Sequence, residues 1–371
     1  MLKPIFTLDY EIHGNGDGCP FELMVEPTRR MLDQFDQYGA KLTIMADVAE
    51  ILKFNEYKEQ FGRDDYHYDA IAEQLKDAIR RGHDVQLHLH ASYFNARFEN
   101  GGWVQDWSEY NFAGLPLDRI RQVVRIGKEY LEGLLKPVNA NYQCVAFRAA
   151  NWSVSPSRNV ITALHENGIR IETSVFKHGR RDGIVSFDYS NAHSDLVPWR
   201  VADDDVCKRD DSGKLLEIPI YCERRWIGAF VTPNRIYRAA LSRSHRVAKT
   251  YTANQATTSS TKSGMSGKGG VFNKLSMLTK RHPWKADFNQ CSGRQLIAAL
   301  KRAEATHATA GVELPFVLIG HSKIFTRLNE SSLQPFLKFV KRLPERFRFE
   351  TLAMCDPGVT FAQMSKSLSD L

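Results

Sequence analysis

Short apolar runs alternate along the chain with longer segments in which apolar residues recur every three to four positions. The short runs predict strands at residues 3–9, 41–46, 84–90, 144–148, 169–175, 215–221, 315–320 and 347–352. The longer segments predict helices at 27–38, 68–81, 117–135, 157–167, 292–308 and 332–342. Strands that alternate with helices are typical of a parallel sheet, here a barrel, with its active site at the carboxyl ends of the strands.

One predicted strand carries two imidazoles. Residues 82–90 read GHDVQLHLH, so at strand period His88 and His90 point to one face while the leucines point to the other. Neutral imidazole is the commonest metal ligand in proteins, and two on one rigid strand form half of a metal site. A pair of hydrogen-bonded barrel histidines is the structural alternative.

Three other strand ends also carry polar residues. Asp9 and Glu11 follow the first strand at positions i and i+2, and would share a face. Arg148 directly follows a buried run and needs a carboxylate partner. His321 comes directly after the strand at 315–320. Each signal alone is weak, but together these strand ends indicate one site.

In these segments the chain resembles the polysaccharide deacetylases of the NodB-homology superfamily, carbohydrate esterase family 4. In that family the first motif supplies a catalytic-base Asp and a metal-binding carboxylate, which resemble Asp9 and Glu11. The second motif places its first metal His where His88 stands. The later motifs supply an Arg that orients the base and a His that acts as general acid, similar to Arg148 and His321.

The matching motifs extend from residue 5 to residue 323, and the resemblance implies a distorted (β/α)7-type barrel. It also implies a pocket wall at Trp152, next to Asn151, and we expect both residues to bind substrate. Trp199 is a further candidate for stacking on a sugar ring, although an aromatic residue there is as often part of the core.

The chain departs from the family at one metal ligand. The second metal His of the family usually lies four residues after the first, and here that residue is Ser92. A hydroxyl is a poor zinc ligand, so His90, on the same strand face as His88, is the expected substitute. The predicted metal ligands are therefore Glu11, His88 and His90. The expected ion is zinc, with cobalt or a similar divalent ion as the alternative.

These residue types allow metal-assisted amide hydrolysis. A bound divalent ion lowers the pKa of its water and stabilises the oxyanion. Asp9 would take the proton of that water, Arg148 would keep Asp9 ionised, and His321 would protonate the departing amine. The resemblance implies that the amide is an N-acetyl group on a sugar.

The length and the cysteines indicate where such an enzyme would act. We expect residues 1–371 to form a single barrel domain, and no apolar run is long enough to span a membrane. The first strand begins close to residue 1, and the six cysteines form no C-x-x-C pair, so we expect a cytoplasmic protein. The substrate would then be a nucleotide sugar or a lipid-linked glycan precursor in surface-polysaccharide biosynthesis.

Basic residues gather in one part of the chain. Residues 224–286 contain thirteen Lys or Arg and no Asp or Glu, although the formal net charge of the whole chain is only +7. Within this part, residues 240–285 are expected to form a basic, flexible insertion. A solvated loop is the simpler interpretation. The functional one is peripheral contact with anionic membrane lipid, and no nucleic-acid-binding fold accompanies the charge.

Two other functions remain open from the sequence. The same barrel and metal could hydrolyse another non-peptide C–N bond, such as a formamide or a cyclic amide. A catalytically impaired barrel that binds glycan is the second alternative, and Ser92 in the ligand position motivates it. A base at Asp9 and an acid at His321 favour an enzyme over a binding module.

Overall fold

The computed structural model describes residues 1–12, 18–241, 280–308 and 311–356. Within these residues, parallel strands follow one another round a barrel. In spatial order they are β1 (Leu2–Tyr10), β2 (Leu42–Asp47), β3 (Asp84–Leu89), β6 (Ala146–Ala149), β7 (Ile171–Glu172), β12 (Leu216–Glu217) and β15 (Leu314–His321). The chain beyond β12 closes the barrel, because Ile220 forms a parallel bridge with Val317. The predicted (β/α)7-type barrel is confirmed.

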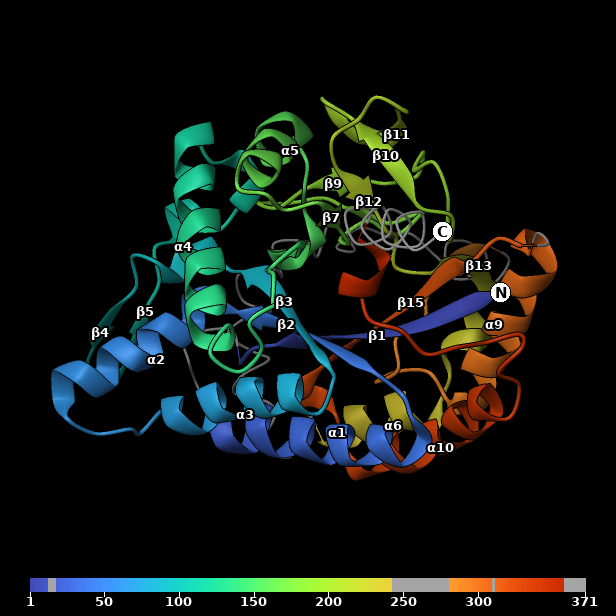
Figure 1. Ribbon diagram of the computed structural model, residues 1–371, viewed down its shortest axis with the longest axis horizontal. Helices are drawn as coiled ribbons and strands as arrows, with labels where there is room; N and C mark the ends of the chain where they lie inside the picture. The colour runs from blue at the N-terminus through green and yellow to red at the C-terminus, as the bar shows by residue number, and fades with distance from the viewer. Residues whose placement is uncertain (13–17, 242–279, 309–310, 357–371) are drawn as a thin grey trace, which may run out of the picture.

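Helices connect successive barrel strands and pack on the outside of the barrel (Figure 1). They are α1 (Glu26–Tyr38), α2 (Val48–Phe61), α3 (Tyr68–Arg80), α4 (Leu117–Leu135), α5 (Ser157–Glu166), α6 (Pro233–Leu241), α9 (Gly293–His307) and α10 (Arg327–Lys341). Figure 1 shows α1, α3 and α10 along one side, with α4 and α5 further round. The six predicted helices are all present, and the structure adds α2 and α6.

Short antiparallel strands lie outside the barrel. They pair as β4 (Arg97–Glu99) with β5 (Gly102–Val104), β8 (Arg180–Arg181) with β9 (Phe187–Asp188), β10 (Trp199–Ala202) with β11 (Asp205–Arg209), and β13 (Cys222–Trp226) with β14 (Arg281–Lys285). Strand β10 also pairs with β12, so the β10–β11 hairpin extends the sheet outside the barrel.

Side chains on the barrel strands alternate between the interior and the helices. Phe6 of β1 packs against Phe35 of α1 and Phe336 of α10, with ring centroids 4.6 and 5.8 Å apart. Tyr10, on the same face, donates a hydrogen bond to Gln74 of α3 at 2.7 Å. Thr7 and Asp9, on the opposite face of β1, therefore point toward the interior of the barrel.

Two sequence predictions need correction. Residues 347–352 form no regular strand; Phe347 makes a single bridge to Leu2, and the pairing with β1 does not continue past Pro4 because β2 occupies that side of β1 from Phe6 onward. Helix α10 begins five residues before the predicted position 332, because Thr326 and Asn329 form a capping box there.

Most of the predicted insertion at 240–285 lies outside the described residues. The part of the chain that the structure describes includes no helix that is both long and apolar enough to cross a bilayer.

Candidate metal and hydrolytic site

The carboxyl ends of neighbouring strands bring the predicted site residues together. Asp9 of β1 lies beside His321 of β15 in the strand register, and His88 of β3 lies beside Arg148 of β6. Glu11 follows β1 directly. All of these except His321 are at most 4% exposed. Barrel closure therefore gathers residues that are far apart in the sequence.

Asp9 lies between a guanidinium and an imidazole. Its Oδ1 accepts a hydrogen bond from Nη1 of Arg148 at 2.7 Å, and its Oδ2 lies 3.5 Å from Nε2 of His321. Burial alone would raise the pKa of Asp9, but Arg148 and His321 more than offset this effect and lower it. The Asp9 carboxylate is thus held in its ionised form, as a general base requires.

Arg148 is fixed in place by the barrel. It is fully buried, and its Nε donates to the carbonyl of Thr173 at 3.0 Å. Its Nη2 and Nδ1 of His321 are buried and have no hydrogen-bond partner among the described residues. Buried polar groups are rarely left unpaired, so these two nitrogen atoms indicate a place for water or substrate.

Glu11, His88 and His90 form a compact cluster. Oε2 of Glu11 lies 3.1 Å from Nε2 of His88 and 3.2 Å from Nδ1 of His90. One ligand atom from each residue lies within 4.8 Å of the other two. Ligand atoms bound at about 2.0 Å in a tetrahedral site lie about 3.3 Å apart, so these distances suit a small divalent ion. The cluster could hold a metal ion.

The electrostatics of the cluster also favour a cation. Nδ1 of His88 donates to the carbonyl oxygen of Arg148 at 2.8 Å, so Nε2, 3.1 Å from Oε2 of Glu11, is the nitrogen that donates to this carboxylate when protonated and could bind an ion when not. Burial alone would lower the pKa of His88, yet the hydrogen bond to Glu11 and nearby carboxylates raise it to about 9. A buried site that raises a histidine pKa so far is one that attracts positive charge.

Two residues that the sequence analysis assigned no role complete the cluster. Asp47, at the end of β2, accepts hydrogen bonds from the backbone N–H of His90 at 3.1 Å and from its Nδ1 at 2.9 Å. Lys323 donates to Oε1 of Glu11 at 2.8 Å. Asp47, fully buried, directly follows the strand predicted at 41–46, and Lys323 stands two residues after His321. In the sequence, these positions next to a predicted strand and close to His321 were the signals that could have identified the two residues.

Ser92 does not take part in the cluster. It lies in a single 3-10 turn after His90, and its hydroxyl donates to Oε1 of Gln105 at 2.8 Å. The Ser92 hydroxyl is therefore engaged outside the cluster. It stands at the position of the family's second metal His but does not act as a ligand. His13, a weaker candidate ligand, lies outside the described residues.

Asn151 and Trp152 form a strained turn beside the site. Their φ angles are 57° and 58°, in the left-handed region that residues with side chains seldom adopt. Arg181 donates to Oδ1 of Asn151 at 3.0 Å, and Tyr189 donates to the carbonyl of Trp152 at 2.7 Å. The strain places the Trp152 ring edge-to-face against the His321 ring, with centroids 5.9 Å apart.

Trp199 is buried in the core, in contrast to the expectation that it lies open to a sugar ring. Its side chain is 2% exposed, and its Nε1 donates to the carbonyl of Val206 at 2.9 Å within the β10–β11 hairpin. Because the indole is enclosed by the core, it offers no free face to a sugar. The prediction that Trp199 stacks on substrate is wrong.

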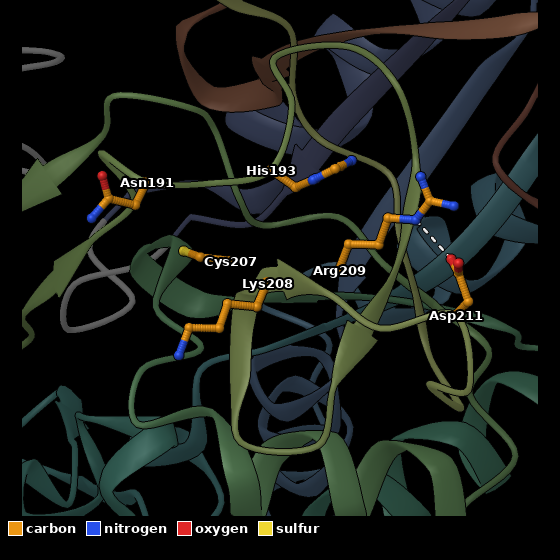
Figure 2. A pocket seen from close by; sticks show the side chains of 6 residues that line it. All are labelled: Asn191, His193, Cys207, Lys208, Arg209 and Asp211. Atoms are coloured by element: carbon orange, nitrogen blue, oxygen red, sulfur yellow. Dashed lines mark hydrogen bonds and ion pairs between the residues drawn. The ribbon is translucent and has the colours of Figure 1, made fainter.

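A separate hollow of about 540 Å³ lies at the β10–β11 hairpin, and Figure 2 shows the side chains that line it. These are Asn191, His193, Cys207, Lys208, Arg209 and Asp211. Arg209 pairs with Asp211 at 2.7 Å, and Lys208 pairs with Asp205 at 3.2 Å. Since its cations already have carboxylate partners, this hollow is a poor candidate for an anion site.

Comparisons with known proteins give similar structures only. No protein-family model and no curated protein matches the chain. A protein of Mycobacterium smegmatis described as a polysaccharide deacetylase has a TM-score of 0.49 at 14% identity, over 98% of this chain and 91% of its own. A GH57-type branching enzyme of Pyrococcus horikoshii has a TM-score of 0.49 at 12% identity, over 95% of this chain and 69% of its own. Puue allantoinase has a TM-score of 0.46 at 12% identity, over 95% and 88%.

The three descriptions name different activities, so the roles of individual residues rest on the geometry of the site.

Proposed function

We propose that this chain is a metal-dependent hydrolase of the polysaccharide deacetylase superfamily, which removes the N-acetyl group of a sugar. One observation carries the proposal: the buried Asp9 carboxylate lies between Arg148 and His321, next to the cluster of Glu11, His88 and His90. A base, an acid and a candidate metal site in one place are what hydrolysis of an amide requires.

Asp9, Arg148 and His321 would handle the protons. Asp9 takes a proton from the attacking water, and Arg148 keeps the Asp9 carboxylate ionised and fixes its orientation. His321 delivers a proton to the departing amine, which is a poor leaving group without one. The 3.5 Å between Oδ2 of Asp9 and Nε2 of His321 is short enough for these two residues to exchange the proton through a small movement.

Glu11, His88 and His90 would hold the ion, which we propose to be zinc, with cobalt as the nearest alternative. An ion held by these three residues would supply a water whose pKa is lowered from about 15.7 to near 7, and so a nucleophile at neutral pH. Asp47 accepts from the backbone N–H of His90 and would hold this residue in place while its Nδ1 faces the ion. Trp152 and Asn151 would bind the sugar, because they form the wall next to His321.

The substrate and location remain proposals. We propose a nucleotide sugar or a lipid-linked glycan precursor as the substrate and a cytoplasmic location for the enzyme, on the basis of the cysteine pattern. The structure has all six cysteines free. The division into one barrel domain at 1–371 with an insertion at 240–285 also remains a prediction.

We also propose a membrane-contact surface, formed by described residues that come shortly before and after residues 242–279 in the sequence. We define the basic-apolar face by residues 224–238 and 280–283. Its exposed apolar side chains are Trp226 (50%), Val231 (69%), Ile236 (61%) and Tyr237 (42%). Arg281 lies 5.4 Å from the Trp226 ring centroid. Apolar side chains among arginines complement an anionic lipid surface.

A second candidate function is a glycan-binding barrel with an impaired centre. Lys323 favours it, because an ammonium on Glu11 competes with a metal ion for that carboxylate. Hydrolysis of another non-peptide C–N bond remains the enzymatic alternative, because the residues of the site indicate the type of reaction and not which molecule carries the bond.

Release of acetate from N-acetylated sugars, including UDP-N-acetylglucosamine, tests the proposed function. The native protein, incubated with zinc or cobalt, should release acetate, and Asp9→Asn should lower the rate by about a hundredfold or more. Asp84→Asn is the matched control, because Asp84 is also a buried barrel aspartate but lies at the opposite end of β3. Equal rates in the native protein and Asp9→Asn would exclude Asp9 as the base.

A further inference from the structure

Lys285 places an ammonium group in an aromatic corner beside the site. Its Nζ lies 3.4 Å from the ring centroid of Trp152 and 4.4 Å from that of Phe176. The two rings meet edge-to-face with centroids 5.9 Å apart. Since the Trp152 ring also meets the His321 ring edge-to-face, the same indole contacts both the ammonium and the proposed acid.

This ammonium has no anionic partner in the described part of the chain. No carboxylate there lies within ion-pairing distance of Nζ. Asp287, the acidic residue nearest in sequence, accepts hydrogen bonds from the backbone N–H groups of Asn289 and Gln290 at 2.9 and 3.1 Å instead. Burial lowers the pKa of Lys285 to about 8. A desolvated cation that contacts only aromatic rings is stabilised when an anion joins it.

Other basic groups lie round the same corner. Arg224 of β13 pairs in register with Pro283 of β14, two residues before Lys285. Arg181 donates a hydrogen bond to Asn151, the residue next to Trp152. Lys285 as a whole residue is of intermediate exposure, while its ammonium is desolvated. The carboxylates of Asp287 and Asp9 also act on Lys285 and offset part of the effect of burial on its pKa, without forming an ion pair with it.

We propose that Lys285 is a specificity-determining residue that binds an anionic oxygen group, a carboxylate or a phosphate, carried by the N-acylated sugar. This inference rests on the proposed function, because it assumes that the sugar amide lies against Asp9 and His321. The substrate would place its anionic group over Trp152 while its amide faces the base. A neutral N-acetyl sugar would leave the ammonium unpaired and bind more weakly.

Calorimetric titration of the intact protein with three probes tests the inference. N-acetylglucosamine is the neutral probe, N-acetylglucosamine 6-phosphate carries a phosphate, and N-acetylmuramic acid carries a carboxylate. The native protein should bind at least one anionic probe about ten- to a hundredfold more tightly than the neutral one. Lys285→Met should remove this preference, and Lys285→Arg should retain most of it.

Lys301→Met is the matched control. Lys301, on helix α9, also has its ammonium over an aromatic ring, 5.1 Å from the ring centroid of Phe339. This variant should retain the native preference. Thermal unfolding of each variant checks that the fold is preserved. The anionic probe that binds more tightly identifies the phosphate or the carboxylate as the natural group. Equal or absent binding of all three probes, or a preference that survives Lys285→Met, overturns the inference.

Acetate release measured with the same three probes separates this inference from the proposed function. Release from all probes at similar rates would support the hydrolase and overturn the role of Lys285. A Lys285-dependent preference for an anionic probe without acetate release would retain the anion site and contradict the hydrolase.

Discussion

Glu11 is the residue at which the opposing charges of the site meet. Its Oε2 faces two imidazoles, and its Oε1 accepts from Lys323 at 2.8 Å. Burial alone would raise the pKa of Glu11, but Lys323 and the histidines lower it well below its usual range. A metal ion that binds this carboxylate therefore shares it with a fixed ammonium, so the affinity of the site is set partly by Lys323.

Removal of that ammonium should strengthen metal binding. In Lys323→Met the carboxylate of Glu11 is left to the ion alone, and Co²⁺ affinity should rise on the order of tenfold. Competition with a chromogenic chelator measures this affinity directly. Lys323→Arg, which retains the positive charge, should bind Co²⁺ about as the native chain does. Equal affinities of the native chain and Lys323→Met would show that the ammonium does not compete with metal.

At this scale the sequence predicted the residues whose positions depend on local geometry. Period-two alternation put Asp9 with Glu11, and His88 with His90, on shared strand faces, and the structure has them so. The position of Lys285 over Trp152 depends on the pairing of β14 with β13. That contact is made between segments distant in the chain, so no local pattern could reveal it.

Strand β3 has two ends with different roles. Its carboxyl end carries His88, while His83, just before its first residue, holds neighbouring elements together. Nδ1 of His83 accepts from the backbone N–H of Leu42 at 3.1 Å, and Nε2 lies 3.0 Å from Asp36 of α1. Burial lowers the pKa of His83 to about 4. This histidine is therefore neutral in the folded chain at neutral pH.

His83 should make the fold sensitive to mild acid. Below its usual pKa of about 6.5 the unfolded chain binds a proton at this residue, while the folded chain does not until about pH 4. The free energy of unfolding should therefore fall by about 2 kcal/mol more between pH 8 and pH 5 in the native chain than in His83→Asn. Urea unfolding at the two pH values measures the difference. Parallel decreases in the two proteins would contradict this role.

The period of apolar residues correctly predicted the helices and strands that pack against the core in the same way along their whole length. Helix α4 covers residues Leu117–Leu135 as predicted, since one apolar face packs throughout. Residues 347–352 have the composition of a strand but meet only the first residues of β1. Whether an apolar run becomes a strand depends on a free neighbouring edge, which the run itself does not specify.

At the scale of the whole molecule, the barrel closes where the chain beyond β12 reaches β15, through Ile220 and Val317. The alternation of strands and helices predicted a barrel, but only the observed register shows which strands meet. On the outside, the basic-apolar face includes the exposed side chains of Trp226 and Ile236. Both residues belong to the stretch 224–286, which contains no Asp or Glu.

The basic-apolar face should bind anionic bilayers. The native protein should sediment with phosphatidylglycerol vesicles and not with phosphatidylcholine vesicles, and high salt should weaken the binding. Replacing both Trp226 and Ile236 by serine should weaken it about tenfold, because two apolar side chains no longer enter the bilayer. Ile184→Ser, at an apolar residue that is 58% exposed elsewhere, is the control. Equal sedimentation with both lipids would exclude this surface.

Elemental analysis of the purified protein tests the central claim most directly. The account predicts about one zinc, cobalt or similar ion per chain in the native protein and in Asp84→Asn, and its loss in Glu11→Ala and His90→Ala. No bound metal in the native protein, even after reconstitution, would contradict the metal-dependent hydrolase and favour the glycan-binding barrel.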